Sequence, residues 1–147
     1  MKKFKSLVDL FSDKSRWLKR QLSGTRTQVD IFCNFRASLP SEESTNCFCL
    51  IGAVFRLSSQ VGALHPVANG RRRIVEDKIK MSYRHALNIA IRRRFPGRRY
   101  FTVEEFNDDF RTTFDDIVVV AEAAEKILAQ SPEGKDILES LLATCDT

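Results

Sequence analysis

The sequence has no long apolar run. Its longest apolar stretch, Cys47 to Phe55, is far shorter than the ~18 residues needed for a membrane-spanning helix. The basic start Met-Lys-Lys-Phe-Lys is not followed by the continuous apolar segment and cleavage site of a secretory signal. We therefore expect a cytoplasmic protein with no membrane partner.

Glycine and proline are also scarce. The 147 residues include six glycines and four prolines, and 43% are hydrophobic and 29% charged. This composition excludes a disordered chain and a fibrous repeat. A chain of this length can bury a core of its own, so we expect a single helical domain over residues 1–147.

Motifs that carry catalysis or hold a metal are missing. The sequence has only two histidines, and its four cysteines contain no C-x-x-C pair. It also lacks a glycine-rich phosphate loop, a serine nucleophile elbow and H-E-x-x-H. The sequence predicts neither a metal site nor a cofactor.

The apolar residues that are present recur mostly at helical spacing. This spacing predicts a mainly α fold, a compact bundle of four to six helices. An N-terminal extension (1–45) is expected to contain a helix over 3–22, which Ser12-Asp13 divides. The segments expected after it are a buried helix over 45–57, a basic helix over 73–94, a short turn from Thr102, an amphipathic helix over 114–128 and a C-terminal helix over 131–144. A period of two over residues 27–37 indicates one short β element.

Charge is distributed unevenly along the chain. Residues 71–99 carry eleven basic side chains and two acidic ones, whereas residues 104–147 carry twelve acidic and three basic. Arginine suits bidentate contacts with phosphate, so this basic segment predicts a surface for nucleic acid or an acidic protein. The candidate polyanion-binding residues are Arg71, Arg72, Arg73, Lys80, Arg84, Arg92, Arg93, Arg94, Arg98 and Arg99.

The same charge pattern has a structural alternative. A basic helix and an acidic helix can pack side by side, either within one chain or between subunits. In the second case the protein oligomerises, and salt should dissociate the assembly because exposed ion pairs are screened.

Cys49 is the candidate for covalent catalysis. If Asn46 caps the helix over 45–57, Cys49 is its third residue, where free N–H groups and the helix dipole lower a thiol pKa. His85 is a candidate base, and Asn107 or Asp108 a candidate to orient its imidazole. The alternative is that Cys49 is a small apolar residue of a buried helix.

Two short stretches carry a family resemblance. Cys49-Leu50-Ile51-Gly52-Ala53 is similar to the C-L-x-G-A motif of a family of small uncharacterised proteins from bacteria and their phages. Phe106-Asn107-Asp108, followed by Arg111-Thr112, resembles that family's W-N-D…R-T segment, with Phe106 in place of the tryptophan. The similarity covers about residues 47–128.

The resemblance implies a helical domain and no catalytic activity. It also implies that the two motifs meet in space: Asn107-Asp108 would cap the start of one helix, while Gly52 would let another helix pack closely. Our leading hypothesis is a non-enzymatic binding protein, an accessory factor of a phage or mobile element. The alternatives are an enzyme that uses Cys49 with His85, and a structural oligomer.

Overall fold

The computed structural model describes residues 2–19, 23–24, 47–66, 68 and 70–146. Its α-helices are α1 (Leu7–Leu10), α3 (Leu50–Gly62), α4 (Arg71–Arg94), α5 (Val103–Asp108), α6 (Phe114–Leu128) and α7 (Pro132–Cys145). A 3-10 turn η1 (Lys14–Arg16) and the strands β1 (Ser23–Gly24) and β2 (Cys47–Phe48) complete the described elements. The prediction of a mainly helical fold is confirmed. The β element predicted over 27–37 lies outside the described residues.

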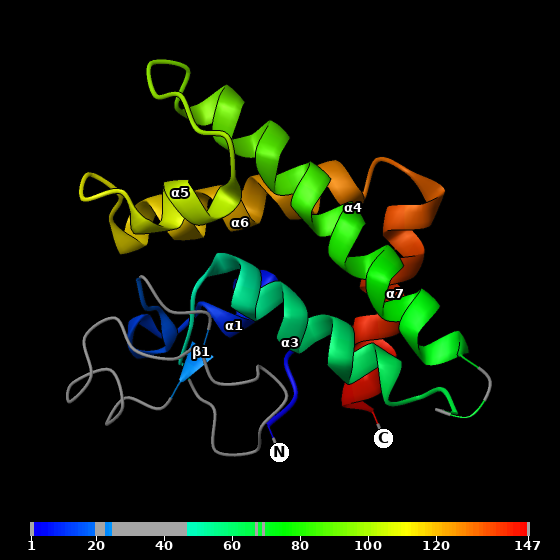
Figure 1. Cartoon of the computed structure of the whole chain (residues 1–147). Helices are drawn as coiled ribbons and strands as arrows, with labels where there is room; N and C mark the ends of the chain where they lie inside the picture. Colours follow the sequence, from blue (N-terminus) through cyan, green and yellow to red (C-terminus); the bar gives the residue numbers. More distant parts are fainter. Residues whose placement is uncertain (1, 20–22, 25–46, 67, 69, 147) are drawn as a thin grey trace.

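The long helix α4 lies across the bundle (Figure 1). It packs against α3 and α6, while α7 contacts both α3 and α6, and α1 also lies on α3 and α6. The helical spacing of apolar residues predicts an inner face of α4 at five positions, and all five are buried: Ile79, Tyr83, Ala86, Leu87 and Ala90. No helix in the described part of the chain is both long and apolar enough to cross a bilayer.

Three helix starts follow the polar residues that mark them in the sequence. The Thr102 hydroxyl accepts the Glu105 N–H at the start of α5, at 3.1 Å. Thr113 and Asp116 form a complete capping box at the start of α6, and Ser131 caps α7 with Pro132 as its first residue. Such caps satisfy N–H groups that have no partner inside the helix, so these boundaries are local properties of the sequence.

The helix predicted over 45–57 begins and ends later than expected. Cys47 and Phe48 form β2, which pairs antiparallel with β1, and the helix α3 starts only at Leu50. Cys49, not Asn46, is its N-cap, and the Cys49 sulfur accepts the Gly52 N–H at 3.2 Å. The helix then continues to Gly62, beyond the predicted end at residue 57.

The N-terminal segment is less helical than its apolar spacing predicts. A helix is predicted over 3–22, but the described residues 2–19 form only the one-turn helix α1 and the turn η1, which the carboxylate of Asp13 caps. Phe4, Leu7, Phe11 and Leu18 are nevertheless buried. The apolar pattern therefore reports burial correctly, whereas the backbone conformation is decided by contacts with distant helices.

Two side chains from distant helices bind the backbone of this N-terminal segment. The amide of Gln60 in α3 accepts the Phe4 N–H at 2.9 Å and donates to the Phe4 carbonyl at 2.8 Å. The carboxylate of Glu125 in α6 accepts the N–H groups of Leu7 and Val8 at 3.1 and 3.0 Å. A carboxylate from another helix thus caps α1, because a helix this short leaves its N–H groups without internal partners.

Helical spacing predicts that the C-terminal helix buries Ile137, Leu138, Leu141 and Leu142, but the structure buries fewer of them. Ile137 and Leu141 are buried and Leu138 is half-buried, but Leu142 is 51% exposed. Because α7 contacts the bundle along one side only, the residue that follows the buried Leu141 projects away from the bundle, and Leu142 is therefore exposed.

We expect Glu125→Gln to destabilise the fold by about 1–3 kcal/mol, because hydrogen bonds to a charged group would be replaced by weaker bonds to an amide that offers one acceptor. Tyr83 Oη also donates to this carboxylate, at 2.7 Å. Urea unfolding monitored by circular dichroism measures the change. Glu122→Gln, an exposed position of the same helix, is the control and should be nearly neutral. Equal effects of the two variants would contradict the capping role.

Candidate polyanion-binding surface

All of the candidate polyanion-binding residues lie on one helix, α4, or on the loop that follows it. The helix begins after Gly70, whose backbone φ of 69° is the left-handed conformation that glycine adopts readily. It ends at Phe95, and its last turn holds three consecutive arginines. The candidates Arg71 to Arg94 are therefore spread along a single rod of 24 residues.

In the first half of α4 the cations pair with carboxylates of the same helix. Arg72 binds Glu76 at 3.0 Å, and Asp77 lies 3.9 Å from Arg73 and 4.0 Å from Lys80. These are the helix's two acidic residues, spaced three and four positions from their partners. The structure thus assigns part of the predicted basic surface to local ion pairs.

The acidic C-terminal third neutralises the middle of α4. Arg84 reaches Glu104 at the start of α5, at 2.9 Å, and Lys78 lies 3.5 Å from Glu133 in α7. The expectation that basic and acidic helices pack together thus describes part of this chain. These pairs are partly exposed, so each contributes only about 0–1 kcal/mol.

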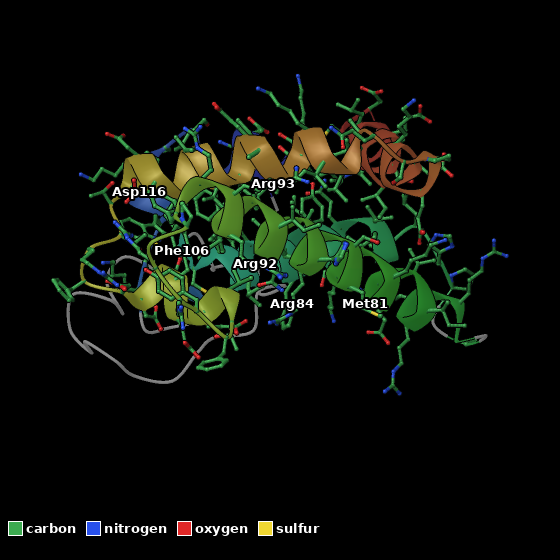
Figure 2. All side chains as sticks on the ribbon, turned by 90° about the horizontal axis from the view of Figure 1, so that it is seen from above. Met81, Arg84, Arg92, Arg93, Phe106 and Asp116 are labelled. Atoms are coloured by element: carbon green, nitrogen blue, oxygen red, sulfur yellow. The ribbon has the colours of Figure 1, made fainter. Side chains whose placement is uncertain are left out.

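The C-terminal end of α4 is different. Arg92, Arg93 and Arg94 are exposed, and within the described ranges none has a carboxylate within ion-pair distance. Consecutive helical residues project about 100° apart, so the three arginines surround the helix end, and Figure 2 shows Arg92 and Arg93 on different sides of the ribbon. Their positive charge also interacts favourably with the negative, C-terminal end of the helix dipole, which is a structural reason for their presence.

The loop after α4 adds one exposed arginine. Arg98 turns inward: its guanidinium lies 4.7 Å from the centre of the Phe95 ring and donates to the Thr112 hydroxyl at 3.4 Å. Arg99 remains exposed. We call the exposed set Arg92, Arg93, Arg94 and Arg99 the arginine end of α4.

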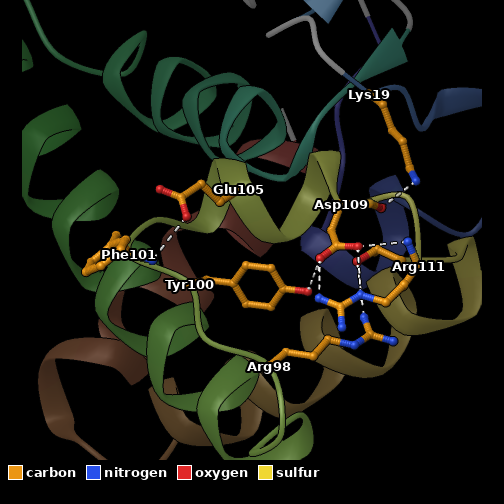
Figure 3. Close-up of polar contacts among 8 residues, drawn as sticks. Lys19, Arg98, Tyr100, Phe101, Glu105, Asp109 and Arg111 are labelled. Carbon is orange, nitrogen blue, oxygen red and sulfur yellow. Dashed lines mark hydrogen bonds and ion pairs between the residues drawn. The ribbon is translucent and has the colours of Figure 1, made fainter.

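The carboxylates near this loop have partners in the same chain (Figure 3). Asp109 receives a bidentate contact from Arg111, at 3.1 and 2.8 Å, and a hydrogen bond from the Tyr100 hydroxyl at 2.8 Å. These bonds, those from Arg111 above all, hold the pKa of Asp109 well below its usual range. Sequence reasoning missed this cluster, because Tyr100 reaches Asp109 only when the loop folds back on the end of α5.

Cys49 does not have the properties of a nucleophile. Its side chain is 5% exposed, and burial raises the pKa of the thiol from 9.0 to about 12, although the Gly52 N–H opposes that shift. This is the opposite of the lowered pKa predicted from a position inside the helix. A thiol buried against apolar side chains keeps its proton.

The candidate base, His85, lies elsewhere. It is exposed on α4 and lines a hollow of about 550 Å³ with Ile74, Met81 and Glu133. The structure therefore does not bring His85 to the buried Cys49, because the two side chains leave their helices towards solvent and core respectively.

Asn107 does meet the Cys49 motif, but as a structural group. Its amide oxygen accepts the Leu50 N–H at 3.1 Å and the Trp17 indole N–H at 2.9 Å. Its amide nitrogen donates to the Leu18 carbonyl and to the Asp108 carboxylate, both at 3.0 Å. Asn107 thus caps the start of α3, as the family resemblance implied. All four hydrogen-bonding positions of the amide are used, so it has none left to orient an imidazole.

The sequence matches a known protein family. Residues 8–127 match the "Family of unknown function (DUF6197)". The chain belongs to this family. The DUF6197 match begins well before the stretch 47–128 identified from the two motifs, so it includes most of the N-terminal segment that Asn107 and Glu125 bind. Comparisons with curated proteins and with solved structures found no match.

We expect Asn107→Asp to destabilise the protein by more than about 3 kcal/mol, because it removes two donors and places a carboxylate in a fully buried site beside Asp108. Thermal and urea unfolding measure the loss. The matched control is Asn88→Asp on α4, where the side chain is partly exposed and the change should stay below about 0.5 kcal/mol. A similar stability for both variants would refute the importance of the buried amide.

Cys49 should resist alkylation in the folded protein at pH 8, whereas the partly exposed Cys145 should react. The raised pKa of Cys49 also predicts a pH dependence of the free energy of unfolding. The contribution of the neutral thiol is complete below pH 9 and is lost as the pH rises towards 12. Iodoacetamide labelling followed by peptide mass spectrometry, with and without urea, tests the first point. Rapid labelling of Cys49 without urea would contradict the burial argument.

Proposed function

We propose that this DUF6197 protein is a non-enzymatic binding protein whose arginine end of α4 binds nucleic acid. The observation that carries the proposal is the separation of paired from unpaired cations along one helix. Arg72 and Arg84 have carboxylate partners within the chain, whereas Arg92, Arg93 and Arg94 are exposed without one in the described part of it.

Unpaired arginines favour a phosphate ligand for a physical reason. A guanidinium that already binds a carboxylate must exchange one anion for another, so it gains little from a new partner. An exposed and unpaired guanidinium can instead form two parallel hydrogen bonds with a phosphate and release the phosphate's counterions. The arginine end therefore accounts for most of the expected affinity.

An acidic protein surface is the alternative ligand for the same side chains. The two ligands differ in charge density, because a duplex carries one negative charge per ~1.7 Å of its axis. A nucleic acid therefore offers more negative charges within reach of the side chains at one helix end than a surface of scattered carboxylates does. Competition by an acidic polypeptide against bound DNA separates the two cases.

The variant Arg92→Gln/Arg93→Gln/Arg94→Gln should bind DNA more weakly than the wild type. If each arginine contacts one phosphate, the slope of log affinity against log salt should fall by about 2–3, since each lost contact removes ~0.7–0.9. Fluorescence anisotropy of labelled single-stranded and duplex DNA over a salt series measures both quantities.

The matched control is Arg71→Gln/Arg72→Gln/Arg73→Gln, which removes three charges from the other end of the same helix. It should change the affinity and the salt slope much less. Equal effects of the two variants would show that net charge, rather than the arginine end, decides binding. Unchanged binding by the first variant would refute the proposal.

A further inference from the structure

The exposed side of the loop after α4 carries an aromatic ring that the fold does not use. Phe101 is 93% exposed. Its neighbour Tyr100, in contrast, packs edge-on against the buried Phe106 with ring centres 5.6 Å apart and donates to Asp109. The fold gains no free energy from a ring this exposed, whereas a ligand that covers the ring would remove its apolar surface from water.

Side chains of this loop alternate along the chain between those that contact the fold and those that are exposed. Arg98 and Tyr100 turn towards the segment 109–112, where they bind Thr112 and Asp109. Arg99 and Phe101 are exposed. Figure 3 shows Tyr100 directed at Asp109 and Arg111, with Phe101 away from that cluster. The loop therefore presents a cation and an aromatic ring together, two residues apart.

The backbone that presents Phe101 is held in place. Its N–H donates to the Glu105 carboxylate at 3.3 Å, and the next residue, Thr102, caps α5. Arg98 ties the start of the loop to Phe95. A ring on an anchored backbone loses little conformational freedom when a ligand covers it.

The charges around the ring indicate which part of a ligand should lie there. Glu104 is paired with Arg84, and Glu105 receives the Phe101 N–H, so both adjacent side chains are carboxylates. A phosphate would be repelled on this side, whereas a neutral base would not. Arg99 lines a hollow with these two carboxylates and Asp109, so the phosphates should instead meet Arg92, Arg93 and Arg94 at the end of α4.

We propose that Phe101 and the arginine end of α4 together recognise unpaired nucleotides, with the phosphates on the arginines and a base stacked on Phe101, so that the protein prefers single-stranded nucleic acid. This inference rests on the proposed function and adds the class of strand. Bases inside a duplex are stacked on each other and cannot cover an aromatic side chain, whereas an unpaired base can.

Anisotropy titrations with a labelled DNA strand and its duplex test the inference on the full chain. The wild type should bind the single strand more tightly. Phe101→Ala should weaken single-strand binding by about tenfold or more and leave duplex binding unchanged, while Phe101→Trp should preserve it. A strand without bases should bind the wild type and Phe101→Ala equally.

Phe110→Ala is the matched control. Phe110 is 90% exposed at the other end of α5, beside Arg111, which Asp109 already engages. If Phe110→Ala weakens binding as much as Phe101→Ala, or if Phe101→Ala affects strand and duplex alike, the stacking role is refuted. If the triple variant at positions 92–94 loses affinity but Phe101→Ala does not, only this inference fails. If the wild type binds neither DNA, both proposals fail.

Discussion

The buried amide of Asn107 joins three parts of the chain that are far apart in sequence. It accepts the first N–H of α3, from Leu50, and the indole N–H of Trp17, and it donates to the carbonyl of Leu18. An amide has two donors and two acceptor positions, and here all are satisfied in a site without water access. Neither an aspartate nor an apolar residue offers this combination. The positions of α3, α5 and the N-terminal segment therefore depend on one side chain.

The N-terminal segment illustrates the same constraint on a larger scale. Its described residues 2–19 form only α1 and the turn η1, yet they lie against the core, where unpaired N–H and C=O groups are costly. Side chains of other helices supply the missing partners: Gln60 for Phe4, Glu125 for α1 and Asn107 for Leu18. This explains how residues 2–19 are held as part of the domain, and it agrees with a family match that starts at residue 8.

Electrostatics divides the molecule into a paired region and an unpaired one. Carboxylates of α4, α5 and α7 form ion pairs with cations in the first two thirds of α4, including Arg72 and Arg84. The last turn of the helix has no such neighbours among the described residues, so its charge is available to a ligand. The family carries no functional assignment, and the proposal therefore rests on this distribution of charge and on the exposed ring of Phe101.

The sequence alone determined the features that depend on residues close together in the chain. The cap at Thr113, the start of α7 at Ser131 and the inner face of α4 were all predictable, because helix caps and apolar periodicity act within one or two turns. Tertiary structure decided the raised pKa of Cys49 and the partner of Arg84. It also decided the short extent of α1. These properties depend on burial and on groups brought from distant positions, and neither is encoded in local spacing.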